Sequence, residues 1–387
     1  LKTVPVDRIA FIVLLGCLAL RWCISREQLS AYPASWPMLA LLLVGLWGVL
    51  AQPNEPQAWS LLAAKWIVPV ALFHVAGNVF RSESALRKLE TFSLVVLVYL
   101  AAMAIFSLLN LSSLLFPKFI LDESLGIHAD RARGPFLQAV ANGVCLNLLG
   151  LVALHSWRRR RLPRVLAAVL FLAVPLALLA TRTRAVWLSA GLSVLALVVF
   201  RFDRRLRRTG LALGALAGFG LCAVTVYEAN SDGLADRLQD RSPVEFRLEM
   251  YQAGWQMFTQ KPITGWGTEA AIQAEIENRV SNFHPERYLF HNTYLELAVE
   301  RGILGLGLYA WLMLCLFRLG RRPTQDPYDT PFLGRQFRML WPVIVGVYLL
   351  NASAVVMNYQ FVNAYLFTLA GILAAQSARN RREYEIA

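Results

Sequence analysis

The feature that most constrains this chain is a series of apolar runs, each about as long as a bilayer is thick. They occupy 6–24, 34–52, 58–79, 89–116, 135–155, 164–180, 185–200, 209–228, 303–319, 337–357 and 361–378. Roughly 20 apolar helical residues cross a hydrocarbon core. Inside lipid a helix satisfies its own backbone hydrogen bonds, whereas an irregular segment does not. The sequence therefore predicts an all-α polytopic membrane protein with eleven spans.

The distribution of basic residues predicts the orientation of these spans. Of the 38 Lys and Arg residues, 23 lie in alternate connections or at the C-terminus, in the segments 21–26, 81–88, 158–164, 201–208, 318–338 and 379–382. By the positive-inside rule these segments face the cytoplasm. The net charge of +13 is therefore explained by topology, and it does not indicate a nucleic-acid-binding surface.

The intervening connections then face outward, and the largest of them is 229–290. This segment divides the chain into an N-terminal membrane bundle (1–228), an outer helical segment (229–290) and C-terminal membrane helices (291–387). An inner C-terminus places Leu1 outside after eleven spans, and the chain begins at Leu rather than Met. We therefore expect a further helix before residue 1, giving about twelve spans with both ends in the cytoplasm.

The outer segment has the signals of a folded helix rather than a linker. Residues 242–245, Ser-Pro-Val-Glu, form a capping box with proline at the first helical position. Phe246, Met250 and Met257 follow at helical spacing, and the segment 262–267, with its Pro and two Gly residues, ends the pattern. We expect helices that lie on the outer face of the membrane.

Polar groups at the outer side are the candidates for chemistry, and His291 is the first of them. It lies where the outer segment re-enters the membrane. On a straight helix it would share a face with Gly302 and Gly305, two small residues that allow a neighbouring helix to approach closely. A neutral imidazole can accept a proton from a hydroxyl group at neutral pH. The alternative is an interfacial histidine bonded only to backbone.

Several cations are predicted on the same side, against the positive-inside bias. They are Arg131, Arg133, Arg182, Arg184, Arg247 and Arg301, together with Lys65, which lies about 10 Å inside the third span. Arginine forks match phosphate oxygens bidentately, so converging arginines indicate a clamp for a phosphate or diphosphate. Lys65 either extends outward along its own stem or contacts an anionic headgroup within the bundle.

No sequence pattern indicates a metal or an organic cofactor. The five cysteines all lie within apolar runs and none has CxxC spacing. Paired carboxylates, a Ser-His-Asp order and a phosphate-binding glycine loop are not found in the sequence. Asp122, Glu123 and Asp130 share one outer loop, but their spacing is unspecific. A histidine base with arginine electrophiles is the expected chemistry.

Four segments together resemble the O-antigen ligase family. His291-Asn292, followed after nine residues by Gly302-Ile303-Leu304-Gly305, resembles that family's His-Asn-x9-Gly-x-x-Gly signature. The segments 131–136 (Arg-Ala-Arg-Gly-Pro-Phe), 181–188 (Thr-Arg-Thr-Arg-Ala-Val-Trp-Leu) and 247–267 are similar to its other recurrent motifs. The order of these motifs and the single large outer segment before the histidine also fit.

The resemblance implies a GT-C-type glycosyltransferase fold in the bacterial inner membrane, with the active site facing the periplasm. Such an enzyme transfers O-antigen polysaccharide from undecaprenyl diphosphate to the lipid A-core, with no metal or other cofactor. It implies His291 as the general base and Arg184 and Arg247 as essential arginines. It further implies Lys65, Arg131, Arg133, Arg182 and Arg301 as substrate contacts.

Two other interpretations remain open. An O-antigen polymerase or a protein O-oligosaccharyltransferase would use the same lipid-linked donor with a different acceptor, although the lack of a sizeable C-terminal periplasmic domain favours a ligase. A lipid-linked glycan flippase or other transporter would show repeated halves and charges at the membrane midplane on several helices. In this sequence only Lys65 is clearly placed that way.

Overall fold

A computed structural model describes residues 6–25, 30–50, 56–126, 128–199, 208, 212, 242–280, 290–321 and 332–386. Every regular element among them is helical, as the apolar runs predict. The N-terminal half contains α1 (Val6–Ser25), α2 (Ser35–Leu50), α3 (Pro56–Leu62), the π-helical turn η1 (Ala63–Ile67), α4 (Val68–Val79), α5 (Glu83–Leu108), α6 (Ala139–Arg158), α7 (Arg164–Ala180) and α8 (Arg184–Val199). Short 3-10 turns lie at Ser112–Leu114, Lys118–Leu121 and Gly134–Phe136.

The second half contains α11 (Ser242–Gln260), α12 (Glu269–Glu277), α13 (Thr293–Arg318), the 3-10 turn η6 (Leu319–Arg321), α14 (Arg335–Ala352) and α15 (Gln360–Ile386). Among the described residues five helical stretches are long and apolar enough to cross a membrane, and α2, α7 and α8 are shorter apolar helices. The molecule is therefore a helical protein of the multi-pass membrane type. The predicted run 209–228 lies outside the described helices.

Three predicted boundaries are wrong. The helix expected at 89–116 is α5, which ends at Leu108, and Asn110 follows with a left-handed backbone (φ 55°). The helix expected at 135–155 begins only at Ala139, because Leu137 has φ 55°. The helix expected at 337–357 ends at Ala352. The helix expected at 303–319 corresponds to the longer segment of α13, which follows a break at Gly302. The apolar composition continues past each of these helix boundaries. Local backbone geometry therefore determines where the helices begin and end.

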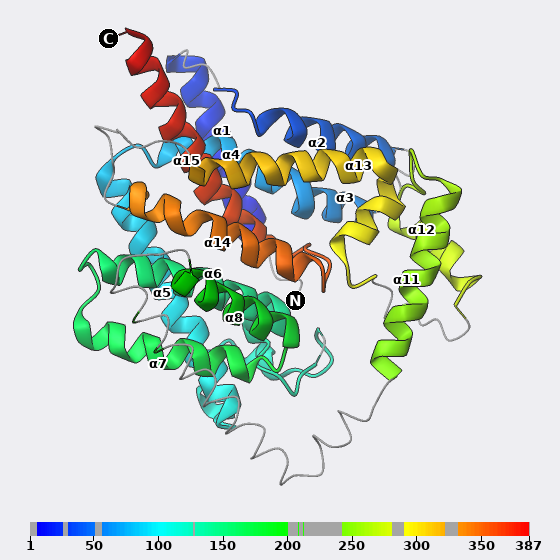
Figure 1. Cartoon of the computed structure of the whole chain (residues 1–387), viewed down its shortest axis with the longest axis horizontal. Helices are drawn as coiled ribbons and strands as arrows, with labels where there is room; N and C mark the ends of the chain where they lie inside the picture. The colour runs from blue at the N-terminus through cyan, green and yellow to red at the C-terminus, as the bar shows by residue number, and fades with distance from the viewer. Residues whose placement is uncertain are drawn as a thin grey trace.

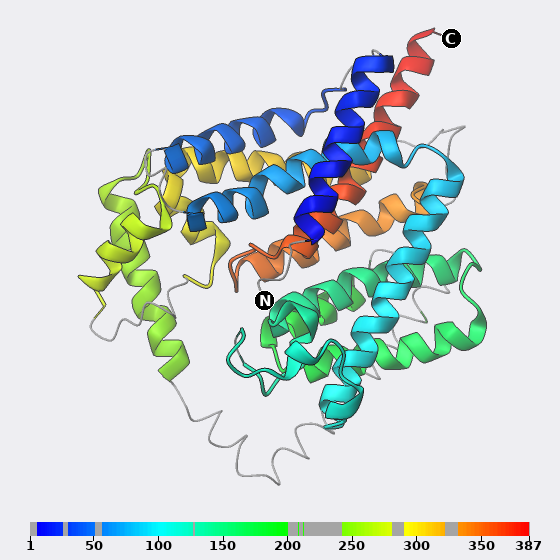
Figure 2. The same ribbon diagram turned by 180° about the vertical axis from the view of Figure 1, so that it is seen from behind.

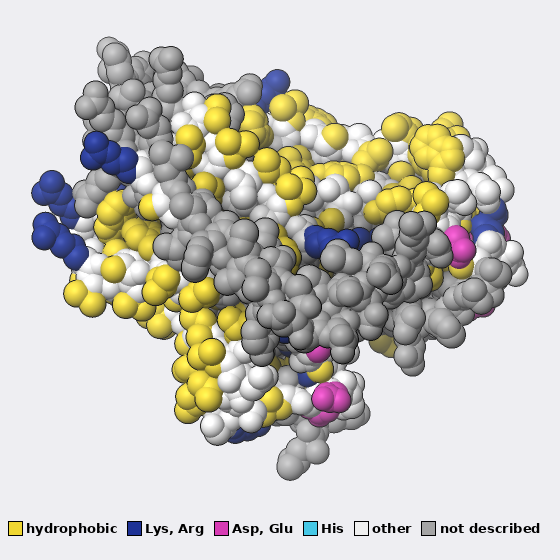
Figure 3. Space-filling model, turned by 60° about the horizontal axis from the view of Figure 1, so that its bottom comes forward, with side chains coloured by type: hydrophobic (Ala, Val, Ile, Leu, Met, Phe, Trp, Pro, Cys, Tyr) yellow, Lys and Arg dark blue, Asp and Glu magenta, His cyan; other side chains and the backbone are white. Residues whose placement is uncertain are grey.

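Most helices of the bundle, including α2, α6, α7, α8, α13 and α14, run roughly alongside one another, so the bundle has two ends (Figure 1). One end, which we call the His291 end, holds the start of α13, the α7–α8 turn and the neighbouring helices α11 and α12. The opposite Arg159 end holds the α6–α7 loop and the start of α14 (Figures 1 and 2). Lys and Arg side chains gather at the left edge of Figure 3, which is the side of the Arg159 end in Figure 1.

The sides of the bundle carry apolar side chains that face outward. Exposed large apolar residues lie along single helices, for example Leu39, Leu43 and Trp47 on α2, and Leu188, Leu192 and Leu195 on α8. Figure 3 shows hydrophobic side chains across much of the described surface. Contiguous exposed apolar surface of this kind marks contact with lipid or another partner. The exposed faces therefore agree with a helical bundle that lies within a membrane.

Candidate functional site

The central element of the site is a break in α13 at Gly302. This glycine has φ 63° and ψ −162°, so the helix divides into a short segment, 293–301, and a longer one. The two segments run in different directions (yellow in Figure 1). A left-handed φ is easily adopted only by glycine, and an added Cβ would collide with the Ile263 carbonyl. The glycine of the His-Asn-x9-Gly signature is thus required by backbone geometry.

The loop 261–267 fills the break and satisfies the exposed backbone groups. Trp266 N–H donates to the Val299 carbonyl at 2.8 Å, and Gly267 N–H donates to the Glu300 carbonyl at 2.9 Å. In return, Ile303 N–H donates to the Pro262 carbonyl at 2.8 Å. Two motifs that are distant in the sequence, Lys-Pro-x-x-Gly-Trp-Gly and the glycine of the histidine motif, therefore form one structural unit.

This arrangement corrects the prediction of a straight small-residue stripe below His291. The break at Gly302 interrupts the face that His291, Gly302 and Gly305 would share, because the helix does not continue in one direction. Gly302 is approached by the loop backbone rather than by another helix. Gly305 is covered by the side chain of Arg301 from the preceding turn. Gly302 therefore accommodates a loop and Gly305 accommodates a side chain of its own helix, and neither forms a contact between two helices there.

His291 lies just before the short segment of α13. Its own φ is 49°, and Asn292 caps the helix by accepting hydrogen bonds from the backbone of Tyr294 (2.9 Å) and Leu295 (3.2 Å). Thr293 fixes this helix start to the segment after α14, since its hydroxyl donates to the Val355 carbonyl and accepts from Met357 N–H. The imidazole is therefore attached to a firmly held helix terminus.

Arg247 lies on α11, which packs on α13. Gly254 makes close contact there: an added Cβ would come within 2.8 Å of Phe290 and 2.9 Å of Leu295. Arg247 precedes Gly254 by two helical turns, so both are on one face of α11, about 10 Å apart along its axis. The expected apolar stripe is confirmed, because Met250 and Met257 are fully buried. The side chains of 242–245, including the predicted capping box, lie outside the described set.

The electrostatic environment of His291 indicates that three segments lie near one another. Its pKa is lowered to about 4, first by burial, then by the positive charge of Arg247, and then by His128. Charge effects of this kind require short separations. The start of α13, the outer helix α11 and the loop around His128 therefore meet at one place, with a neutral imidazole at its centre.

Four of the other predicted arginines, Arg131, Arg133, Arg182 and Arg184, lie in two connected segments at the same end. Ala132 N–H, between Arg131 and Arg133, donates to the Ala180 carbonyl at 3.1 Å, which joins the loop to the α7–α8 turn. In that turn Arg182 has φ 47° and is half-buried, whereas the Arg184 side chain is exposed at the first position of α8. The 128–133 loop and the 181–184 turn are therefore neighbours, and His128 connects them to His291.

Arg133 has its guanidinium committed to backbone carbonyls. It is 1% exposed. Its Nε and Nη2 donate to the Ile120 carbonyl at 3.1 and 2.8 Å, and Nη1 donates to the Leu125 carbonyl at 2.5 Å. Nη2 also donates to the Asp122 carbonyl. The structure thus shows Arg133 holding the 118–126 loop, and its predicted contact with substrate stays a prediction.

Lys65 and Arg301 belong to a second polar group, further along α13. Lys65 Nζ forms ion pairs with Glu296 and, at 3.4 Å, with Glu300. Arg301 Nη1 donates to the Leu41 carbonyl at 3.1 Å, and its guanidinium lies 5.3 Å from the centre of the Trp66 ring. The sequence analysis did not identify the two glutamates. The available signal was two carboxylates spaced i, i+4 within a segment that enters the membrane.

Within the described residues no three His, Cys, Asp or Glu side chains gather as metal ligands would. The candidate site contains the His291 imidazole, with the Arg247 guanidinium and His128 acting on it. Such a site can accept a proton and can bind an oxyanion or a phosphate. Among the predicted residues, the structure brings His291 and Arg247 together with His128, and it joins the loop of Arg131 to the turn of Arg182 and Arg184.

The fold and the site define a class: a polytopic helical membrane protein with a His/Arg site at one end of its bundle. Comparison with protein families identifies the group within that class. Residues 166–310 match the family model described as O-antigen ligase. Residues 166–310 therefore carry a domain of the O-antigen ligase family, as the sequence motifs predicted. A search of curated proteins found no match.

The matched region begins in α7 and ends within α13, so it contains Arg182, Arg184, Arg247, His291 and Arg301. Lys65, Arg131 and Arg133 precede it. The family comprises glycosyltransferase-like enzymes of the O-antigen ligase and polymerase type, and its members handle lipid-linked glycans. The family match therefore covers the part of the chain that carries most of the candidate site.

Proposed function

We propose that this protein transfers a glycan from undecaprenyl diphosphate to a hydroxyl group of the lipid A-core, at the periplasmic face of the bacterial inner membrane. The observation that carries the proposal is the packing of α11, which bears Arg247, against α13 beside His291, within the region that matches the O-antigen ligase family. The Arg-rich loops at the opposite end support a cytoplasmic location for that end.

His291 acts as the general base in this proposal. It takes the proton from the acceptor hydroxyl while that oxygen attacks the anomeric carbon of the donor sugar. The bond from that carbon to the diphosphate oxygen breaks, and undecaprenyl diphosphate leaves with the electron pair. A pKa of about 4 keeps the imidazole neutral at physiological pH. The negative diphosphate raises this pKa when it binds, which makes the base stronger in the occupied site.

Arg247 neutralises the charge that develops on the leaving diphosphate. A guanidinium donates two parallel hydrogen bonds to phosphate oxygens and keeps its charge at any physiological pH. Arg184 extends this clamp, because its exposed side chain begins α8 at the same end of the bundle. Arg182, in the 181–184 turn, and Arg131, in the neighbouring 128–133 loop, also belong to this clamp. Stabilised charge on the leaving group lowers the barrier without a metal ion.

An apolar cavity near the α7–α8 turn suits the hydrocarbon chain of the donor. It has a volume of about 420 Å³ and lies between α6, α7 and α8. Leu178, Leu179 and Trp187 line its wall, and they flank the turn that carries Arg182 and Arg184. An apolar cavity beside two arginines matches a lipid diphosphate, which has an apolar chain and an anionic headgroup.

Transfer in vitro tests the proposal. The purified protein in lipid nanodiscs is given an undecaprenyl-diphosphate glycan and purified lipid A-core, with and without chelator. We expect transfer by the wild type in both conditions and a loss of about 10²–10⁴-fold for His291→Ala. His74→Gln is the matched control, because His74 lies on α4 and bonds Ser35 and the Val70 carbonyl. Unchanged transfer by His291→Ala contradicts the base, and loss with chelator indicates a metal.

The same assay decides the acceptor. A second set of reactions replaces lipid A-core with a second lipid-linked glycan or with an acceptor protein. Transfer only to lipid A-core identifies a ligase. Chain extension of the lipid-linked glycan identifies a polymerase, and a glycosylated protein identifies an O-oligosaccharyltransferase. The proposed role of His291 is the same in all three types of enzyme. The acceptor reactions therefore test the choice of acceptor, and His291→Ala tests the chemistry.

A further inference from the structure

The second polar group of α13 has a composition that does not suit substrate binding. Lys65, Glu296, Glu300 and Arg301 carry two positive and two negative charges in their usual ionised forms. Their side chains are only 9–15% exposed. A site for an anionic diphosphate needs surplus positive charge, which this balanced group does not have. Buried charges are costly unless paired, and within membrane helices they are usually functional.

The group lies next to the weak point of the helix that follows His291. Because α13 breaks at Gly302, the longer segment cannot fix the direction of 293–301 through helix continuity. The short segment spans about 13 Å, and its direction depends on the contacts that it makes with neighbouring elements. Thr293 holds its first residue through the Val355 carbonyl and Met357 N–H, and the 261–267 loop bonds the carbonyls of Val299 and Glu300.

Lys65 and Arg301 hold the short segment along its length, from Glu296 in its first turn to Arg301 before the break. Lys65 comes from η1, a π-helical turn between α3 and α4, and its ion pairs with Glu296 and Glu300 connect that turn to α13. Arg301 reaches to the Leu41 carbonyl on α2. It passes over Gly45, where an added Cβ would lie 2.9 Å from Nη2. Charged side chains thereby tie two neighbouring elements, η1 and α2, to the short segment.

We propose that Lys65, Glu296 and Glu300 are positioning residues that set the location of His291 for proton transfer. This inference rests on the role of His291 as base. In it Lys65 contacts no substrate, contrary to the role that the family resemblance implied. Ion pairs between η1 and the short segment give a defined direction to a segment that backbone continuity leaves free. Misplacement of a catalytic group by about 1 Å can reduce the rate about 100-fold.

Pair reversal separates positioning from substrate binding. Lys65→Met and Glu296→Gln are compared with the neutral pair Lys65→Met/Glu296→Gln and the reversed pair Lys65→Glu/Glu296→Lys. We measure kcat, KM for the lipid-linked donor, and the pH dependence of His291 modification by diethylpyrocarbonate, read by mass spectrometry of its peptide. The modification does not require enzymatic activity.

Each single variant should lower kcat about 10- to 100-fold, with the donor KM changed less than about twofold. Its modification profile should shift toward the ordinary pKa of histidine, because a displaced imidazole is less buried. The reversed pair should recover most of the lost kcat and the wild-type profile, since it keeps one ammonium group facing two carboxylates. Glu90→Gln, which breaks a comparably buried pair with Arg159, should leave the His291 profile unchanged.

Two results would overturn the inference. One is a raised donor KM with unchanged kcat in Lys65→Met and no recovery in the reversed pair, which assigns Lys65 to the diphosphate. The other is a His291 modification profile identical to that of the wild type in every variant. This includes the paired variants, which test the inference even where a single variant folds poorly. Activity retained by His291→Ala would instead contradict the proposed function, and the two failures are therefore distinguishable.

Discussion

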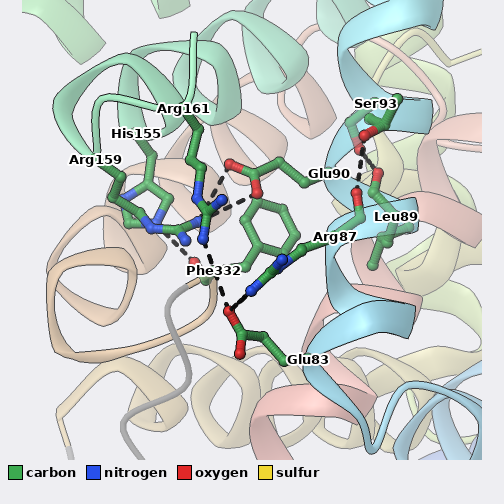
Figure 4. A network of polar contacts seen from close by, with 10 residues as sticks. Glu83, Arg87, Leu89, Glu90, Ser93, His155, Arg159, Arg161 and Phe332 are labelled. Atoms are coloured by element: carbon green, nitrogen blue, oxygen red, sulfur yellow. Dashed lines mark hydrogen bonds and ion pairs between the residues drawn. The ribbon is translucent and has the colours of Figure 1, made fainter.

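The two ends of the bundle both contain networks of arginine or lysine with glutamate, but the networks differ in burial. At the Arg159 end, Arg159 Nη1 lies 3.1 and 3.2 Å from the two oxygens of Glu90. The neighbouring ion pairs of Glu83 with Arg87 and Arg161 are about half exposed. Figure 4 shows how these side chains extend from α5 and the end of α6. This network therefore extends from a buried pair, Glu90 and Arg159, to exposed side chains around Glu83.

At the His291 end each member of the Lys65 group is at most 15% exposed. Exposed ion pairs contribute little to stability and are screened by salt, whereas buried pairs cost several kcal/mol when one partner is removed. Similar side chains therefore serve different purposes at the two ends of the bundle. The exposed part of the Arg159 network lies among the basic loops that define topology, and the Lys65 group fixes a helix segment beside the candidate site.

The largest expected effect comes from removing the break that separates the two segments. Gly302→Ala places a Cβ against the Ile263 carbonyl at a left-handed backbone position. We expect loss of more than about 4 kcal/mol of stability or failure to accumulate folded protein, since strain and collision add. Thermal unfolding in detergent, together with the yield of monodisperse protein, measures it.

Gly307→Ala is the matched control on the same helix, because no atom lies within 4 Å of the position of its added Cβ. Alanine is preferred to glycine within a helix, so this variant should be at least as stable as the wild type. Equal tolerance of both substitutions would contradict the importance of the break. It would also leave the Lys65 group without its proposed purpose.

The next effect concerns the Lys65 group itself. Lys65→Met leaves two buried carboxylates without their ammonium partner, which in general costs about 3–5 kcal/mol. Replacing both partners, as in Lys65→Met/Glu296→Gln, should cost markedly less, because position 296 then holds no buried charge. Chemical or thermal unfolding of the wild type and the two variants measures this difference. A double variant that is less stable than Lys65→Met would show that the pair does not act as a unit.

Both ends show what sequence patterns can predict. The apolar runs predicted the helical class and the positions of most described helices, because lipid permits few alternatives for an apolar run of that length. The helix of Met250 and Met257 and its end before Pro262 also followed from local signals. The His-Asn-x9-Gly string located the candidate site, and the match at 166–310 confirmed the family.

The contacts between distant segments could not be predicted in this way. Nothing local indicates that the 261–267 loop enters the break at Gly302, since both partners are backbone groups. Likewise Lys65 and Glu296 are separated by 231 residues, and only the packing of η1 beside α13 makes them partners. Arg133 looked like the other outer arginines in sequence, but tertiary structure directs its guanidinium to backbone carbonyls.

A smaller effect is expected in the pH dependence at the His291 end. The pKa of His291 is held at about 4 by burial and by Arg247, so the acid limb of kcat/KM should fall near pH 4 instead of 6.5. Because the folded pKa lies below the unfolded value, the histidine's contribution to stability is present above pH 6.5. It is lost as the pH falls toward 4.

Arg247→Gln removes the second cause of this shift but leaves burial, the largest one. The acid limb should therefore move upward and remain below 6.5, whatever happens to the maximal rate. Rate profiles of the wild type and Arg247→Gln measure the shift, over a range from about pH 3.5 to about pH 8 that brackets both pKa values. An unmoved limb would mean that Arg247 does not act on His291.

The smallest effect is expected where the Arg159 network meets solvent. Glu83→Gln removes the acidic partner of Arg87 and Arg161, but all three side chains are 43–52% exposed, and water and salt compensate for the lost charge. We therefore expect a Tm indistinguishable from the wild type and an unchanged pH profile for His291. Glu90→Gln, one step inward beside Arg159, should lower the Tm measurably while leaving that profile unchanged as well. A response of His291 to either substitution would mean that the two ends of the bundle are coupled, and the Lys65 group could then no longer be treated as an independent device of the His291 end.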